Sequence, residues 1–187
     1  MKYFIFTLVL IINIKHVNAQ NSNVGIKSGY NHLTVKETYG SESESTNYNR
    51  VHFGIFVEID ISEKFQFQPE LLYTNTTSFS DNLGFLVLPL LFEYHTSKKM
   101  DFQLGPQLDY GLGDFYGIGF KKLGLSIVGG ISYNISDDFL ISGRYALGLT
   151  NRLDRSDFNN IDFADDPSFR NLESKFRIFE ISLGYRF

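Results

Sequence analysis

The last nine residues of the chain alternate between large apolar and small or polar side chains, and they finish on an aromatic residue. Successive side chains of a β-strand point to opposite faces of the sheet. Phe179, Ile181, Leu183, Tyr185 and Phe187 must therefore meet one apolar medium, while the residues between them meet a polar one. The fold depends on whether that apolar medium is a protein core or lipid.

The first residues of the chain follow the order of a secretory signal. Lys2 precedes the apolar run 3–14, and a small-residue cleavage site ending at Ala19 comes after it. The apolar run falls short of the roughly 20 residues that a membrane-spanning helix needs. We therefore predict a signal peptide at 1–19 and one mature domain at 20–187.

Composition narrows the class of protein. The chain has no cysteine, so an exported form has no disulfide framework, and Gln20 in place of cysteine argues against a lipid-anchored N-terminus. The formal net charge is −4, and Lys2 and Lys15 both lie in the predicted signal peptide. An acidic mature domain argues against nucleic acid as a partner and against attachment to anionic lipid through a basic patch.

A period-two alternation of apolar and polar residues predicts eight strands in the mature domain. The connections alternate between short and long, so all the short turns lie at one end, which is typical of an outer-membrane barrel. The predicted strands are 24–33, 51–61, 65–76, 83–94, 100–112, 123–135, 139–150 and 174–187. The short connections are 62–64, 97–99 and 136–138, and the long ones are about 34–50, 77–82, 113–122 and 151–173.

The contents of the two faces favour lipid as the apolar medium. The polar face is rich in glycine, which weakens strands and has no advantage on a solvated surface, whereas a narrow barrel must fit small residues into its interior. The apolar face carries aromatic residues toward both ends and mostly aliphatic residues between them. We predict an all-β, eight-stranded antiparallel up-and-down transmembrane β-barrel with short periplasmic turns and longer extracellular loops. A soluble barrel or sandwich is the alternative.

Three prolines lie inside the predicted strands. Pro69, Pro89 and Pro106 each remove a backbone donor from a ladder. An unpaired carbonyl is costly in lipid, so we expect bulges at these positions or hydrogen-bond partners from the interior.

The proline segments also carry a family resemblance. QPELLY at 68–73, LVLPLL at 86–91 and GP at 105–106, with GIKSGYN at 25–31, resemble the PorT-like outer-membrane β-barrel family over essentially the whole mature chain. The resemblance implies an eight-stranded barrel in the outer membrane of a Gram-negative bacterium, and it implies no catalytic residues. Some members of that family are linked to protein secretion, a role that these short motifs do not carry over by themselves.

Five charged residues fall on the inward face of the predicted barrel. Lys27, Glu58, Glu70, Arg144 and Glu180 lie near mid-height on neighbouring strands, with the last strand closing on the first. Opposite charges on adjacent strands stabilise pairing, and a poorly hydrated ion needs a partner. We predict an interior charge network that plugs the lumen, with a proton or ion path as the alternative. Three carboxylates face two cations, so we expect Glu58 and Glu70 to share an incompletely paired site.

Enzyme chemistry is not favoured by the positions of the histidines. A hydrolase would need a histidine within hydrogen-bond reach of a serine, with a carboxylate behind it. Ser28 and His32 share a face, but four residues along a strand span about 13 Å. His52 points inward near the long loops and His95 lies at a short turn, so we interpret both as hydrogen-bonding or interfacial residues. We predict no catalytic, cofactor-binding or metal-binding residues.

The long loops are the places where binding would have to occur. The polar segment 34–50 is predicted to be a mobile, solvated loop, and segment 151–173 mixes charges with apolar side chains. These apolar residues can pack as a lid over the barrel or contact a protein or glycan, and calcium binding by the aspartates of the same loop is a third alternative. The candidate contact residues are Phe158, Ile161, Phe163 and Phe169, and the aspartates are Asp162, Asp165 and Asp166.

Together these features predict a non-enzymatic outer-membrane barrel with a structural or binding role through its extracellular loops. The alternatives are a narrow pore or transport-associated barrel, an accessory component of protein secretion, and a lipid-modifying enzyme. The expected partners are outer-membrane lipid and a protein or glycan at the loops, with no cofactor and no nucleic acid. We expect a monomer.

Overall fold

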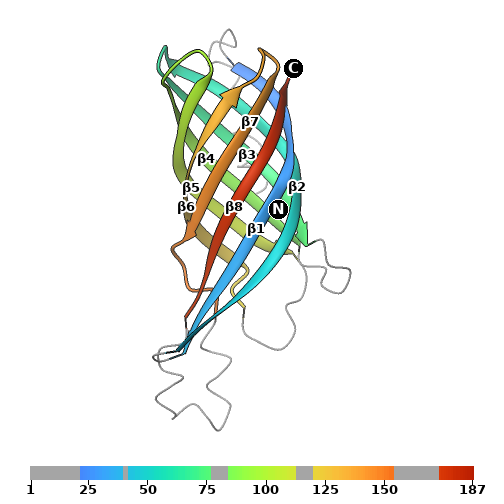
Figure 1. Ribbon diagram of the computed structural model, residues 1–187, viewed down its shortest axis with the longest axis vertical. Helices are drawn as coiled ribbons and strands as arrows, with labels where there is room; N and C mark the ends of the chain where they lie inside the picture. The colour runs from blue at the N-terminus through green and yellow to red at the C-terminus, as the bar shows by residue number, and fades with distance from the viewer. Residues whose placement is uncertain (1–21, 40–41, 77–83, 113–119, 154–172) are drawn as a thin grey trace, which may run out of the picture.

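A computed structural model of the chain describes residues 22–39, 42–76, 84–112, 120–153 and 173–187. Within these ranges the backbone forms eight strands that close into one barrel (Figure 1). No helix in this part of the chain is long and apolar enough to cross a membrane. The strands are β1 (Ser22–Tyr39), β2 (Glu42–Ser62), β3 (Phe65–Thr76), β4 (Gly84–His95), β5 (Met100–Leu112), β6 (Leu123–Asn134), β7 (Phe139–Gly148) and β8 (Glu173–Arg186).

Each strand pairs antiparallel with its neighbours in chain order, and β1 pairs with β8 to close the barrel. The predicted eight-stranded up-and-down barrel is therefore confirmed. Strands β3 and β5 have the bounds that the alternation predicted. The three short turns and the C-terminus lie together at the upper end of Figure 1, which we call the turn end, and the opposite end is the loop end. The predicted signal peptide at 1–19 lies outside the described residues.

The prediction of a loop over 34–50 was wrong, because most of this segment continues the β1–β2 hairpin. The register runs without interruption from Thr34↔Asn47 to Tyr39↔Glu42, and β1 stays paired with β8 as far as Thr38↔Glu173. Thr34 Oγ1 donates a hydrogen bond to Asn47 Oδ1 across the hairpin at 2.8 Å. Threonine, valine and tyrosine favour extended backbone, but outside a membrane neither face of a hairpin has to be apolar, so the period-two signal is absent here.

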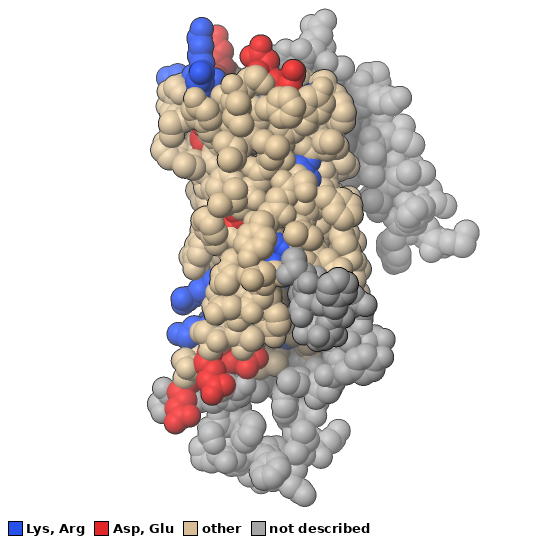
Figure 2. Space-filling view, turned by 45° about the vertical axis from the view of Figure 1, so that its right-hand side comes forward, with Lys and Arg blue, Asp and Glu red and all other residues tan. Residues whose placement is uncertain are grey.

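The burial pattern is the inverse of that in a soluble protein, because the exposed face is apolar and the buried face carries charged side chains. Large apolar side chains are exposed on every strand, with Leu104 at 62% and Phe53 at 60% exposure, while charged side chains such as Arg50 are 2% exposed. Figure 2 shows the resulting wall as a mostly uncharged band with charged side chains gathered toward its two ends. An uninterrupted apolar exterior of this kind is what a bilayer requires of a barrel.

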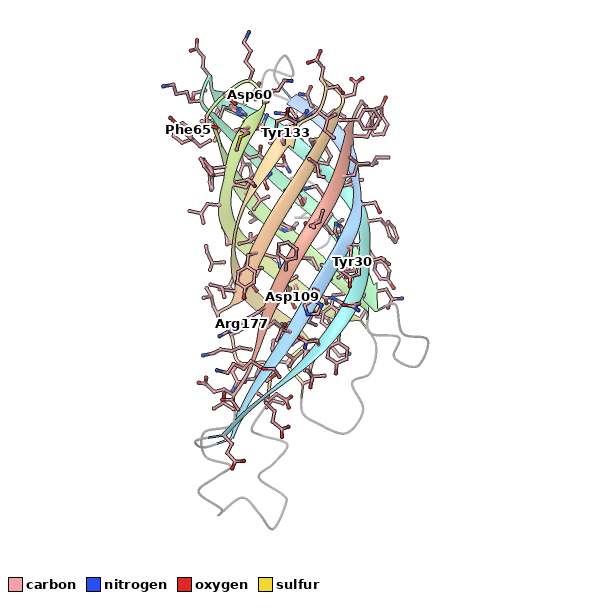
Figure 3. All side chains as sticks on the ribbon, viewed as in Figure 1. Tyr30, Asp60, Phe65, Asp109, Tyr133 and Arg177 are labelled. Carbon is pink, nitrogen blue, oxygen red and sulfur yellow. The ribbon has the colours of Figure 1, made fainter. Side chains whose placement is uncertain are left out.

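Aromatic side chains lie toward both ends of the exterior. Near the turn end Phe65 packs on Tyr94 at 5.2 Å between ring centroids, and Phe139 packs on Tyr185 at 5.0 Å. In the half nearer the loops Phe53 packs on Tyr73 at 5.5 Å. Figure 3 labels Phe65 and Tyr133 near the turn end and Tyr30 in the opposite half. Such cross-strand aromatic pairs stabilise the sheet where interfacial residues are favoured.

Serine closes each short turn in the same way. The first residue of the turn is a serine whose hydroxyl oxygen accepts a hydrogen bond from the backbone N–H three residues later. The N···O distances are 3.2 Å at Ser62, 3.1 Å at Ser97 and 3.1 Å at Ser136.

The prolines are accommodated without bulges, so the first of the two expected arrangements was wrong. The β2–β3 register is the same on both sides of Pro69, the β3–β4 register is the same on both sides of Pro89, and the β4–β5 register is the same on both sides of Pro106. Each ladder is only interrupted for two residue pairs beside its proline. The one register shift in these ladders lies between Asp60 and Ser62, near the turn end.

Candidate functional site

The interior contains a charge cluster centred on Glu70 of β3. Lys27 of β1 donates to Glu70 Oε1 at 2.6 Å, and Arg144 of β7 donates through Nη1 to Oε2 at 2.7 Å and through Nη2 to Oε1 at 2.8 Å. Gln68 Nε2 also donates to Oε1, at 2.5 Å. The side chains of Glu70 and Lys27 are fully buried and that of Arg144 is 2% exposed. The carboxylate therefore bridges strands from opposite parts of the barrel through charge-assisted hydrogen bonds.

Arg144 extends this cluster toward two further carboxylates. Its Nε donates to Gln103 Oε1 at 2.6 Å, and Gln103 Nε2 donates to Glu93 Oε1 at 2.5 Å. Its Nη1 lies 3.6 Å from Glu180 Oε1 on the paired strand. The sequence interpretation had not included Glu93, although the same inward alternation that places Glu70 in the lumen also places Glu93 there.

Glu58 belongs to a separate group near the turn end, so the expectation that it shares a site with Glu70 was wrong. Both carboxylate oxygens of Glu58 lie 2.8 Å from Arg186 Nε, and Asn23 Nδ2 donates to Glu58 Oε2 at 3.3 Å. Arg186 Nη2 also donates to Asn134 Oδ1 at 2.7 Å. The penultimate residue of the chain therefore supplies the cation that the sequence-based count of charges lacked.

A serine, a histidine and a carboxylate meet inside the barrel, as a hydrolase would require, but their order is wrong for catalysis. His52 Nε2 lies 3.0 Å from Ser182 Oγ, and the same hydroxyl donates to Glu180 Oε1 at 3.0 Å. Glu180 approaches Nε2 of the histidine at 4.0 Å, whereas the buried Nδ1 has no hydrogen-bond partner among the described residues. A triad needs the carboxylate on Nδ1 to orient the ring for proton transfer from serine. His52 and Ser182 are also 1% and 2% exposed, so a substrate cannot reach them.

Arginine and aromatic rings fill the lumen toward the loop end. Arg152, which follows β7, lies 4.6 Å from the ring centroid of Phe176 and 4.9 Å from that of Phe120, and its Nη2 donates to Asp109 Oδ2 at 2.5 Å. Its backbone N–H donates to the carbonyl of Ser174 at 2.9 Å. The segment after β7 therefore turns back over the barrel interior. The sequence analysis had placed Arg152 in the long loop 151–173 and had not predicted that its side chain enters the lumen.

An apolar cluster of the interior includes Phe85 and Phe176, two of the rings that Arg152 contacts. Its members are Leu33, Leu72, Phe85, Val87, Leu91, Val128, Ala146, Phe176 and Ile178. Arg50, which is 2% exposed, stacks over Phe85 at 5.3 Å and donates to Asn31 Oδ1 at 2.8 Å. The interior therefore contains a polar layer around Glu70 and a packed apolar layer toward the loop end.

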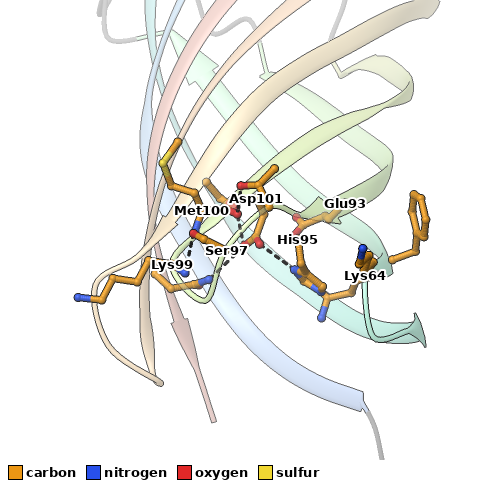
Figure 4. Close-up of polar contacts among 12 residues, drawn as sticks. Lys64, Glu93, His95, Ser97, Lys99, Met100 and Asp101 are labelled. Carbon is orange, nitrogen blue, oxygen red and sulfur yellow. Dashed lines mark hydrogen bonds and ion pairs between the residues drawn. The ribbon is translucent and has the colours of Figure 1, made fainter.

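The turn end is closed by a third polar group, shown in Figure 4. His95 of β4 contacts Asp101 of β5 at 2.7 Å, and Asp101 Oδ2 accepts a hydrogen bond from Asn134 Nδ2 at 3.0 Å and another from Ser132 Oγ at 3.4 Å. These side chains join strands β4, β5 and β6. The contact explains His95 as a partly exposed hydrogen-bonding residue at a short turn.

Several predicted features lie outside the described residues. The candidate loop contacts Phe158, Ile161, Phe163 and Phe169 fall in the segment 154–172, as do the three aspartates considered for calcium. Among the described residues no group of three or more His, Asp or Glu side chains is placed to hold a metal ion.

The comparisons with known proteins agree with this architecture. Residues 18–154 match a family model described as outer membrane protein beta-barrel domain. The crystal structure of Ail, the attachment invasion locus protein of Yersinia pestis, is similar with a TM-score of 0.50 and 14% identity over 90% of this chain and all of that one. The crystal structure of the outer membrane protein OprG from Pseudomonas aeruginosa has a TM-score of 0.45 and 12% identity over 89% of this chain and 96% of that one. No curated protein matches the chain in sequence. At 14% identity the Ail structure bears on the fold alone.

Proposed function

Because the chain belongs to the outer membrane protein beta-barrel domain family, we propose that it is a non-enzymatic barrel of the outer membrane whose filled interior holds the wall together and whose loop end carries its binding activity. Family membership indicates the outer membrane as the location. The short turns then face the periplasm and the loop end faces the outside. We further propose that the segment 1–19 is the export signal removed from the mature protein.

One observation supports this proposal over a pore: the described residues place several groups of buried, mutually contacting side chains inside the lumen. The side chains of Lys27, Glu70 and Arg144 are at most 2% exposed, and an apolar cluster that contacts Arg152 packs in the same interior. Eight strands enclose an interior that side chains can fill. An ion would have to displace paired charges and a packed apolar cluster to cross.

Conductance measurements test the closed lumen. The mature protein, refolded into detergent and checked for heat-modifiable gel mobility, is added to a planar lipid bilayer. We expect no discrete conductance steps above those of a detergent blank. Reproducible steps from the folded fraction would contradict the closed lumen and support the runner-up function, a narrow pore.

The site chemistry supports a binding role in preference to catalysis. Among the described residues, the one hydrogen bond between a serine hydroxyl and a histidine ring lies inside the lumen, and that ring lacks a carboxylate on Nδ1. The β1–β2 hairpin, in contrast, continues as paired strands to Tyr39 and Glu42, and in Figure 1 it reaches beyond the other strands at the loop end. We propose that this hairpin and the neighbouring loops present a binding surface to a protein or glycan, with the barrel as a monomer.

The PorT-like motifs support placing the chain in that narrower family of outer-membrane barrels. The segments at 68–73, 86–91 and 105–106 surround the three ladder prolines, so their sequence is tied to an unusual feature of this wall. A role as an accessory component of secretion is the second proposal that these motifs support. Comparing secreted proteins between wild-type cells and a deletion strain tests it, and an unchanged secretome would rule it out.

A further inference from the structure

Three basic side chains gather on the outer surface of the barrel at the junction of β1 and β8. Lys36 is directly opposite Lys175 in the β1–β8 ladder, and Arg177 follows on the same face of β8, opposite Thr34. Alternation along the strands places all three side chains outward, on the face that carries Phe179. We call Lys36, Lys175 and Arg177 the basic patch.

The basic patch lies just beyond the lipid-facing wall. Arg177 is two positions from the exposed Phe179 on the same face, and its partner on β7 is the exposed Leu147. Figure 3 shows Arg177 projecting from the barrel on the loop side of Tyr30. In Figure 2 basic side chains project from the lower part of the wall, between the uncharged band and the acidic side chains at the lower end. This is the depth of lipid headgroups relative to an aromatic belt.

The charges of the basic patch are only partly balanced by the protein. Lys175 pairs with Glu173 at 2.9 Å, and both side chains are nearly half exposed. Lys36 and Arg177 have no ion-pair or hydrogen-bond partner among the described residues. Like charges directly opposite each other destabilise a strand pair, so the Lys36–Lys175 arrangement needs an external anion to be favourable.

The hairpin is also charged differently on its two faces. The inward-facing positions of the same β1–β2 extension carry Glu37, Glu42 and Glu44, while the cations point toward the surrounding membrane. The overall negative charge had argued against basic-patch binding to lipid, but net charge does not reveal cations that folding brings together from positions 36 and 175–177.

We propose that the basic patch binds the phosphorylated headgroup of an outer-leaflet glycolipid. The proposal rests on the outer-membrane location argued above. A lipid headgroup fits better than free phosphate because the cations adjoin an apolar wall that would contact the acyl chains of the same molecule. Each cation near an anionic membrane surface contributes about a fivefold increase in affinity.

Binding of diphosphoryl lipid A to the folded barrel tests the proposal. The barrel is inserted into phosphatidylcholine nanodiscs, and lipid A retention is measured at increasing lipid A content. The test variant carries Lys36→Gln, Lys175→Gln and Arg177→Gln. The matched control carries Lys64→Gln, Lys98→Gln and Lys99→Gln, which remove the same charge from exposed positions at the turn end.

We expect the test variant to bind between about tenfold and a hundredfold more weakly, and the control variant to bind like wild type. Glu173→Gln should strengthen binding about fivefold, because it releases Lys175 from its ion pair. Wild type and the test variant should bind dephosphorylated lipid A equally. Inorganic phosphate should compete with lipid A only at a concentration far above that of lipid A.

If wild type and test variant bind lipid A equally and both show heat-modifiable mobility, the proposed role of the basic patch is wrong. The proposed function of the protein would remain intact. Equal losses in the two triple variants would show a general charge effect and also overturn it. Failure of wild type to insert into nanodiscs would instead contradict the outer-membrane function itself. Competition by inorganic phosphate at the same concentration as lipid A would overturn the choice of a lipid headgroup.

Discussion

Glu70 is the residue on which the interior cluster depends, because Lys27, Arg144 and Gln68 all donate to its one carboxylate. Each of these partners comes from a buried position whose charge or amide has been removed from water. Breaking a buried ion pair is costly because it leaves the partner charge uncompensated, even where the intact pair contributes little net stability.

Glu70→Ala should therefore lower the free energy of unfolding by about 3 to 5 kcal/mol. Urea unfolding of the protein refolded in detergent or lipid measures the change. The matched control is Glu173→Ala, which removes a carboxylate from an exposed ion pair and should cost less than about 1 kcal/mol. Equal effects of the two substitutions would show that the Glu70 site is hydrated.

Gly54 on the inward face has a different cause from the one that the sequence suggested. We expected small residues because the lumen is narrow, but at Gly54 a Cβ would overlap the backbone carbonyl of Leu71 on the neighbouring strand. The glycine is therefore required by the close approach of β3 to β2. At the lipid-facing Gly143, in contrast, no atom lies within 4 Å of the position that a Cβ would take.

Gly54→Ala should destabilise the barrel by about 1 to 3 kcal/mol, because a backbone atom cannot yield as a flexible side chain can. Gly143→Ala should be neutral or stabilise by up to about 1 kcal/mol, since it reduces the entropy of the unfolded chain. Unfolding midpoints of the two variants, measured side by side, separate the effects. A tolerated Gly54→Ala would mean that the strands separate easily at this position.

At the scale of the elements, the prolines define a weak region of the wall. The interrupted pairs beside Pro69, Pro89 and Pro106 lie in three successive ladders, from β2–β3 to β4–β5, and the register continues past each of them. A proline that only omits one ladder bond leaves the facing carbonyl without its backbone donor. In lipid such a group is more costly than in water.

Pro69→Ala should restore the missing donor and raise the free energy of unfolding by about 1 kcal/mol. The side chain at 69 is lipid-facing and only partly buried, so its loss removes few contacts. Hydrogen exchange should then show a protected amide at position 69, which the wild-type chain lacks. Destabilisation without amide protection would show that the backbone at this position is held away from β2.

The strands that were well predicted are those whose two faces meet lipid and lumen. In β5 the burial alternates at nearly every residue, so a period of two was visible over its full length. The hairpin extension was missed because both of its faces lie beyond the hydrocarbon layer of the bilayer, where Thr34 to Thr38 need not alternate. Arg152 was missed because it follows the last alternating residue of β7. Arg186 was missed as a partner of Glu58 because the two lie on strands that are not paired with each other, with β1 between them.

At the scale of the whole molecule, the interior network follows from closure. The strand alternation predicted that Lys27, Glu58, Glu70, Arg144 and Glu180 face inward, but which of them touch depends on the stagger between strands. Glu70 and Arg144 are 74 residues apart in the chain and lie on β3 and β7, so only the closed barrel brings them together. Pairing of adjacent strands could not reveal contacts that cross the lumen.

Cysteine labelling can determine which end of the barrel faces the outside of the cell. If the short turns face the periplasm, the hairpin side chain at position 45 lies outside the cell. The turn side chain at position 98 then lies on the periplasmic side of the outer membrane. Both positions are exposed and the natural chain has no cysteine, so a single introduced thiol reports its own location. Ser45→Cys should react with a membrane-impermeant maleimide on intact cells, and Lys98→Cys should react only after the outer membrane is permeabilised. The opposite result would reverse the orientation and place the basic patch at the inner leaflet, where the glycolipid headgroup is absent. Reaction of both variants on intact cells would indicate a barrel that is not inserted. The two thiols therefore distinguish the expected topology from an inverted one and from a failure to insert.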